Sequence, residues 1–229
     1  MTGKDLHHAR TEKGWTQEDT ARRLGVSQPY LSLLENGSRR VPAKLAHRAS
    51  TLFDLSPTSL PMKANWHSLG ETENALLASD LSALGYPGFA YLKYTRKRNP
   101  AEVLLSALSA NDLEPRLTEA LPWVLVTYPD LDWEWLLRAV KVHDLQNKLG
   151  FLTSVARRFA WKLGKRDAAA IMRDKESLLE HSRLVRQETL CHESLTRAER
   201  KWLKSNRSKE AKHWHLLTDL SPEHLSNVV

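Results

Sequence analysis

Side chains able to act as nucleophiles, acid–base catalysts or metal ligands are few in this sequence, and their spacing does not suit catalysis. Cys191 is followed by His192 and Glu193, but neighbours on a helix point about 100° apart, and a cysteine–histidine dyad is normally assembled from distant segments. On a helix, His213 and His215 would point to different faces, so they could not both bind one metal ion. We therefore expect a binding protein with no catalytic residue, metal or cofactor, rather than an enzyme.

The composition points to a polyanionic partner. Lys and Arg outnumber Asp and Glu by 34 to 27 in the 229 residues, a formal net charge of +7, which favours nucleic acid without proving it. A single cysteine excludes an internal disulfide and multi-cysteine zinc frameworks, and it suits a reducing compartment. The N-terminus lacks the apolar run of a signal peptide, and no stretch approaches the roughly 20 apolar residues of a membrane helix. We expect a cytoplasmic protein without membrane contact.

Helical periodicity dominates the pattern of apolar residues, and alternating runs of Val, Ile and Thr are scarce, which predicts an all-α fold. Short helices fill the first fifty residues. The first should stop at Gly14, where a left-handed conformation costs glycine little. The second begins after the capping residue Thr16 and ends at Gly25, and the third runs from Ser27 to about Asn36. The sequence thus predicts a helix, a tight turn and another helix.

This arrangement resembles the lambda-repressor-like, or XRE-type, helix-turn-helix family of DNA-binding proteins, which implies a five-helix domain over residues 1–62. Polar and apolar positions agree across four consecutive elements. Two positions depart from the family pattern, since Thr20 replaces an aliphatic residue and Trp15 replaces a leucine. The matching positions are Arg10, Gly14, Thr16, Gln17, Ala21, Leu24, Gly25, Val26, Ser27, Gln28, Leu31, Ser32, Glu35, Asn36, Gly37, Arg39 and Pro42.

The resemblance implies that the third helix enters the major groove of double-stranded DNA and reads base edges with its N-terminal residues. Gln28 is the first candidate, because its amide offers one donor and one acceptor that match N7 and N6 of adenine. The alternative for Gln28 is a solvated surface amide. Ser27, Pro29 and Tyr30 are the other candidate base contacts, and Tyr30 could equally pack against the domain.

Contacts to the DNA backbone and one ion pair follow from the same resemblance. Gln17, at the start of the second helix, is expected to bind a phosphate and to buttress Gln28. Arg10 and Glu35 are expected to form a partly buried structural ion pair. The other expected backbone contacts, for which a solvated surface is the alternative, are Ser32, Arg39, Arg40 and Lys44.

The rest of the chain predicts a linker at residues 63–74 and a larger helical domain at 75–229. Seven of the eight tryptophans lie beyond residue 62. That much tryptophan belongs in a core or against a partner, because its large apolar surface is costly to expose. We therefore expect this domain to bind a partner or to form a dimer.

A long antiparallel helical hairpin is predicted inside this domain. Apolar residues recur every three or four positions from Leu145 to Leu163 and stop before Gly164. A second helix then follows, with Ile171, Leu178 and Val185 expected on one buried face. The hairpin would serve either the packing of the domain itself or a dimer seam.

A small DNA-binding head followed by a larger helical domain resembles the antitoxins and regulators of toxin–antitoxin modules, and residues 121–125 and 144–151 are similar to strings in large antitoxins. This resemblance implies a homodimeric repressor that binds a palindromic operator, regulates its own promoter and neutralises a toxin through its C-terminal domain. One alternative is a stand-alone repressor whose C-terminal domain senses a ligand and dimerises. Another is an enzyme that the head targets to DNA.

Positive charge is enriched in the head without being confined to it. Residues 1–62 hold nine Lys and Arg against six Asp and Glu, a net charge of +3. Elsewhere a basic cluster stands out, which is either a second polyanion contact or a solvated loop. This cluster consists of Lys93, Arg96, Lys97 and Arg98.

Overall fold

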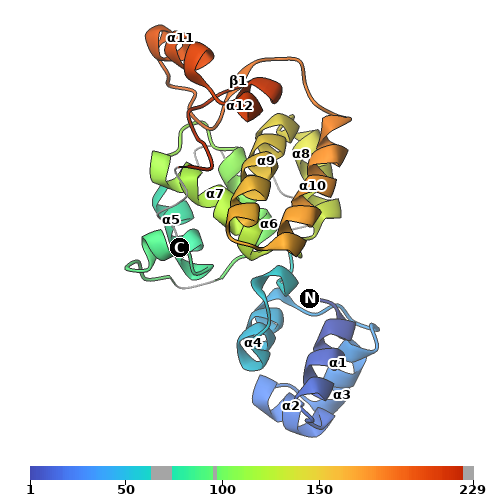
Figure 1. Cartoon of the computed structure of the whole chain (residues 1–229). Coiled ribbons are helices and arrows are strands. Elements are labelled where there is room, and N and C mark those ends of the chain that lie inside the picture. Colours follow the sequence, from blue (N-terminus) through green and yellow to red (C-terminus); the bar gives the residue numbers. More distant parts are fainter. Residues whose placement is uncertain (63–73, 95–96, 224–229) are drawn as a thin grey trace. The chain divides into compact units, whose positions relative to one another are not determined.

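The computed structural model describes residues 1–62, 74–94 and 97–223. These residues form two compact units, one made of 1–62 with 97–99 and one made of 74–94 with 100–223 (Figure 1). Helices dominate both units, and only two strands of two residues each occur in the described ranges, so the all-α prediction is confirmed. No described helix is both long and apolar enough to cross a membrane.

The first unit contains four α-helices and one turn of 3-10 helix, in the order that the sequence predicts. Each of the first three helices begins after a residue whose hydroxyl accepts a backbone N–H of the first turn: Thr2, Thr16 and Ser27. The elements are α1 (Gly3–Glu12), α2 (Gln17–Leu24), α3 (Gln28–Glu35), α4 (Ala43–Phe53) and η1 (Pro57–Ser59).

Leucine and aromatic side chains from all four α-helices form the core of the first unit. Leu6, Leu24, Leu31 and Phe53 are among its buried members. Close packing of α1 against α3 requires the glycine at position 3, since a Cβ there would lie 1.9 Å from the carbonyl oxygen of Leu34. The first turn of α1 is therefore held against the end of α3.

A segment distant in sequence also belongs to the first unit. The buried side-chain amide of Asn99 donates hydrogen bonds to the carbonyl oxygens of Thr58, at 3.0 Å, and Leu60, at 2.7 Å. Residues 97–99, which the sequence assigns to the second domain, therefore pack with the first. Residues 63–73 of the predicted linker lie outside the described residues, as does Arg96 of the basic cluster.

The second unit is built around one long helix, α9 (Gln146–Lys162). The helix α10 (Arg166–Glu180) follows it after a short turn and packs along it, which confirms the predicted hairpin. The helix α7 (Pro115–Thr127) packs on α9 as well. The other elements are α5 (Asn74–Ala83), η2 (Pro87–Phe89), α6 (Pro100–Leu108), α8 (Trp133–Val142), β1 (Glu188–Thr189), α11 (Arg197–Asn206), α12 (Lys209–His213) and β2 (Leu216–Leu217).

The buried face of α10 differs from the predicted one. Leu178 is 50% exposed, Ile171 is only half-buried, and Val185 lies beyond the end of the helix. The residues that follow the predicted ones in sequence, Met172 and Leu179, are fully buried instead. Both sets of residues have a seven-residue repeat, so periodicity alone does not decide which one faces α9.

Trp214 anchors the C-terminal part of the second unit to α9. Its ring is fully buried, and its Nε1 donates to the hydroxyl oxygen of Ser154 at 2.8 Å. Gly150 makes room for the ring, because a Cβ at this position would lie 2.4 Å from it. Tryptophan is not uniformly buried, since Trp161 and Trp202 are 61% and 58% exposed.

Replacement of Thr20 by valine should stabilise the first unit by about 1 kcal/mol, because the valine has the same shape and removes a buried hydroxyl that finds no partner among the described residues. Thr16→Val is the matched control in the same helix. It should cost about 1 kcal/mol, since it removes the N-cap of α2. Urea unfolding followed on amide signals of the first unit measures both changes. Equal effects of the two variants would contradict the prediction.

Gly150→Ala should destabilise the second unit by about 1–3 kcal/mol, because the added methyl group overpacks the Trp214 ring. Helix propensity alone predicts the opposite, a gain of about 1 kcal/mol. Urea unfolding followed by tryptophan fluorescence checks the sign. In a Trp214→Leu background the same substitution should be neutral or stabilising, and an unchanged cost there would mean that the clash is not its cause.

Candidate nucleic-acid interface

The turn between α2 and α3 is fixed by local hydrogen bonds. Gly25 adopts a positive φ of 62°, which ends α2, and the N–H of Val26 reaches back to the carbonyl oxygen of Ala21 at 2.9 Å. Ser27 then caps α3 by accepting the N–H of Tyr30 at 3.4 Å. The start of α3 is thereby held in a set direction relative to α2.

Two glutamine side chains link α2 and α3 at this point. Gln28 donates from Nε2 to Oε1 of Gln17 at 2.7 Å, and Gln17 donates from Nε2 to Oε2 of Glu35 at 2.9 Å. An ionised carboxylate only accepts hydrogen bonds, so it decides which end of the Gln17 amide faces it, and through Gln17 it decides the orientation of Gln28. Within the described residues, Oε1 and the second N–H of the Gln28 amide have no partner and are available to an outside one.

The carboxylate of Glu35 is almost completely buried, with 3% of its side chain exposed. Arg10 holds both oxygens, with Nε donating to Oε1 at 2.7 Å and Nη2 donating to Oε2 at 3.0 Å. His7 lies 3.2 Å from Oε2 through Nδ1. Burial alone would raise the pKa of Glu35, but the hydrogen bonds from Arg10, Gln17 and His7 outweigh it and lower that pKa. The carboxylate is therefore ionised at neutral pH.

Arg10 also ties this carboxylate to the turn before α2. Its Nη1 donates to the carbonyl oxygen of Trp15 at 3.0 Å. Its pKa is raised above the ordinary arginine value, chiefly by the hydrogen bond to Glu35. The structure thus forms the ion pair that the sequence predicts and extends it to α1, α2 and α3.

The other candidate base contacts are placed unequally. Pro29 is exposed at the start of α3, whereas Ser27 uses its hydroxyl as the helix cap. Tyr30 is half-buried and packs against the core, and the Arg39 guanidinium lies 5.8 Å from the centre of its ring. Inward packing therefore occupies much of the Tyr30 side chain.

The candidate backbone contacts surround this helix. Ser32 is half-buried on α3, while Arg39, Arg40 and Lys44 are exposed on the following loop and the first turn of α4. One residue that the sequence reasoning missed is Leu33, which is 39% exposed. Its spacing of four from Pro29 places it on the outer face of α3, and that spacing was the available signal.

Cys191 and His213, both within the described residues, are engaged in structural contacts. Cys191 lies outside any helix, is fully buried, and its Sγ contacts the carbonyl oxygen of Ala107 at 3.2 Å. Burial raises the pKa of this thiol to about 11, so it is protonated at neutral pH and not nucleophilic. His213 pairs with Glu180 at 2.6 Å. No group of three potential metal ligands occurs in the described ranges.

Comparison with known proteins identifies the first unit. Residues 6–60, about a quarter of the chain, match the family model described as helix-turn-helix. This segment is an XRE-type, lambda-repressor-like domain, and the match supports a DNA-binding transcriptional regulator. No curated protein and no solved structure matches the chain. The resemblance of the second half to antitoxins has no support from these comparisons.

The lowered pKa of Glu35 predicts how the stability of the first unit depends on pH. A carboxylate whose pKa is lower in the folded state stabilises the fold above its unfolded pKa of about 4.3, and this contribution disappears as the pH falls through the folded pKa. Urea unfolding between pH 6 and pH 3, followed on amide signals of α1 to α3, should show the loss.

Glu35→Gln should flatten this pH profile and lower stability at pH 7, since Arg10 loses its buried counter-ion. Glu12→Gln is the control, because Glu12 is an exposed carboxylate at the end of α1 and pairs only with His8 among the described residues. An unchanged pH profile in the Glu35 variant would refute the assignment.

Proposed function

We propose that the chain is a sequence-specific DNA-binding repressor that reads adenine through Gln28. The orientation of Gln28 by Gln17 and Glu35 is the observation that carries this proposal. The free Oε1 and the remaining N–H of Gln28 form the planar acceptor–donor pair that matches N6 and N7 of adenine. A solvated surface amide would not need a buried carboxylate to fix its direction.

Residues around the start of α3 are suited to contact the phosphates of the DNA. Gln17 lies in the first turn of α2, where free N–H groups and the positive end of the helix dipole favour a phosphate. Exposed Arg39, Arg40 and Lys44 supply positive charge on the loop and helix that follow α3. Two copies of the chain on a palindromic operator would place two α3 helices in successive major grooves, about 34–36 Å apart.

For the second unit we propose the capture of a partner toxin, so that the chain acts as an autoregulating antitoxin. Support comes from the resemblance of its sequence to large antitoxins and from the exposure of Trp161. The guanidinium of Arg166 lies 3.6 Å from the centre of this ring, and Trp and Arg are the residues most enriched in protein–protein hot spots.

A ligand-sensing repressor is the second candidate, and one observation favours it. The second unit contains a cavity of about 590 Å³, within the size range of small-molecule sites. In this alternative the second unit binds a metabolite instead of a toxin.

Gln28→Ala should weaken binding to the operator about 5- to 150-fold, the equivalent of about 1–3 kcal/mol. The operator is located by footprinting the chain's own promoter, and affinity is measured by fluorescence anisotropy at fixed salt. Replacing the contacted adenine should weaken the wild type and leave the variant almost unaffected, because the pairing is already absent.

Lys44→Gln is the control for this experiment. It should weaken binding to all sequences alike and reduce the salt dependence by the equivalent of about one phosphate contact. If Gln28→Ala bound the operator with wild-type affinity and selectivity, the assignment of Gln28 would be wrong.

Co-expression with the neighbouring gene tests the antitoxin proposal. The neighbouring product alone should arrest growth, and this chain should restore growth and form a stable complex with it. Trp161→Ala should weaken that complex at least tenfold, whereas Leu178→Ala, at another exposed apolar position of the hairpin, should leave it intact. A harmless neighbouring product would contradict the antitoxin role and favour the ligand-sensing alternative.

A further inference from the structure

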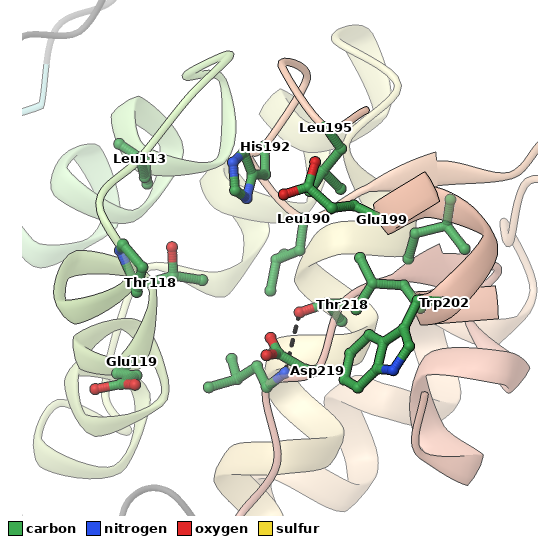
Figure 2. Close-up of a pocket in the computed structure, with 14 residues that line it drawn as sticks. Leu113, Thr118, Glu119, Leu190, His192, Leu195, Glu199, Trp202, Thr218 and Asp219 are labelled. Atoms are coloured by element: carbon green, nitrogen blue, oxygen red, sulfur yellow. Dashed lines mark hydrogen bonds between the residues drawn. The ribbon is translucent and has the colours of Figure 1, made fainter. Parts of the chain in front are cut away.

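The cavity of about 590 Å³ in the second unit lies between α7, α11 and the chain around β2. Figure 2 shows Thr118 and Glu119 of α7 on one side and Glu199 and Trp202 of α11 on the other. Its apolar floor is made of leucines that are themselves at most 7% exposed, namely Leu113, Leu190, Leu203, Leu217 and Leu220. The floor therefore suits an apolar body rather than a hydrated ion.

Three carboxylates line this cavity, from Glu119, Glu199 and Asp219, and no Lys or Arg does. Within the described residues, the carboxylates of Glu119 and Asp219 make neither a hydrogen bond nor an ion pair, so no partner neutralises their charge. Glu199 accepts from the N–H and the hydroxyl of Thr196, both at 2.7 Å, which lowers its pKa and keeps it ionised. His192 is the other titratable lining residue.

Negative charge in this cavity contrasts with the chain as a whole, whose formal charge is +7. A concave, partly apolar site lined by charges of one sign focuses the field and attracts ligands of the opposite sign. Two further groups could hold such a ligand. Trp202 offers an exposed indole face for a cation. Thr218, which is only 8% exposed, accepts the N–H of Leu220, and its own hydroxyl hydrogen has no acceptor among the described residues.

We propose that this cavity binds an organic cation, whose ammonium or guanidinium group is attracted by the summed negative charge of Glu119, Glu199 and Asp219 and whose apolar body lies on the leucine floor. The site does not depend on DNA binding by the first unit, and it gives the ligand-sensing alternative a chemical class of ligand. The volume is sufficient for a free small molecule, and a free small molecule is the ligand that we expect. A lysine or arginine side chain of a protein presents the same chemistry and is tested separately.

Three probes of one shape and different charge test the proposal: phenethylammonium, 2-phenylethanol and phenylacetate. Ligand-observed NMR titrations use the full-length protein. We expect phenethylammonium to bind at least tenfold more tightly than 2-phenylethanol and phenylacetate not to bind measurably. Benzylguanidinium should behave like phenethylammonium. Failure of both cations to bind, or equal binding of the three charge forms, would overturn the proposal.

Charge-removing variants locate the site. Glu119→Gln and Asp219→Asn should each weaken phenethylammonium binding by about three- to fivefold, as expected for a partly exposed charge pair. Adding Glu199→Gln should abolish the preference for the cation over the alcohol. Glu134→Gln is the control, because this carboxylate is exposed on α8 and does not line the cavity. Equal affinity in the triple variant and the control would place binding elsewhere.

A peptide arm separates the two sources of the cation. Acetyl-Phe-Lys-amide carries the same ring and charge on a backbone, and we expect it to bind more weakly than phenethylammonium because the cavity has a limited volume. Tighter binding of the peptide would overturn the small-molecule proposal in favour of a protein ligand. Thermal unfolding monitored by circular dichroism should be the same for all variants, so that lost binding reports the site and not the fold.

Discussion

The buried carboxylate of Glu35 is the group on which the first unit depends. An ion removed from water must be paired and hydrogen-bonded, and here Arg10, Gln17 and His7 supply these partners from α1 and α2 while Glu35 itself ends α3. One buried charge therefore links the three helices, in addition to their shared hydrophobic core. The same charge is only an acceptor, and so it orients Gln17 and, through it, Gln28. The carboxylate of Glu35 thus contributes both to the packing of the first unit and to the direction of the Gln28 side chain.

Shape rather than charge organises the second unit. Gly150 leaves a recess on α9, and the Trp214 ring fills it with its N–H bonded to Ser154. Trp214 follows α12 and precedes β2, so its burial brings the C-terminal part of the chain against α9. The strand β2 pairs with β1, and the chain around β2 then faces α7 and α11 across the cavity of about 590 Å³. The position of the cavity wall formed by the chain around β2 thus depends on the packing of Trp214 against α9.

Helix ends in the first unit follow closely from the sequence because their causes are local. Thr16, Ser27 and Gly25 act on groups within a few residues, so their types and spacing are sufficient to place α2 and α3. The buried face of α10 was predicted wrongly by one residue position. Leu178 and Leu179 each belong to a row of apolar residues with a seven-residue repeat, and packing against α9 decides which row is buried. The attachment of residues 97–99 to the first unit spans about forty positions and leaves no local signal.

The residue types of the candidate DNA interface, and the order of its helices, were determined by the sequence alone. Only the tertiary structure decided that Glu35, Gln17 and Gln28 form one directed chain, that Tyr30 packs inward and that Leu33 faces out. Likewise, no local pattern joins the carboxylates of the cavity, which come from three separate segments. Capping and periodicity act over a few residues, whereas burial and hydrogen bonding between helices depend on which segments meet. That physical difference separates what could be predicted here from what had to be seen in the structure.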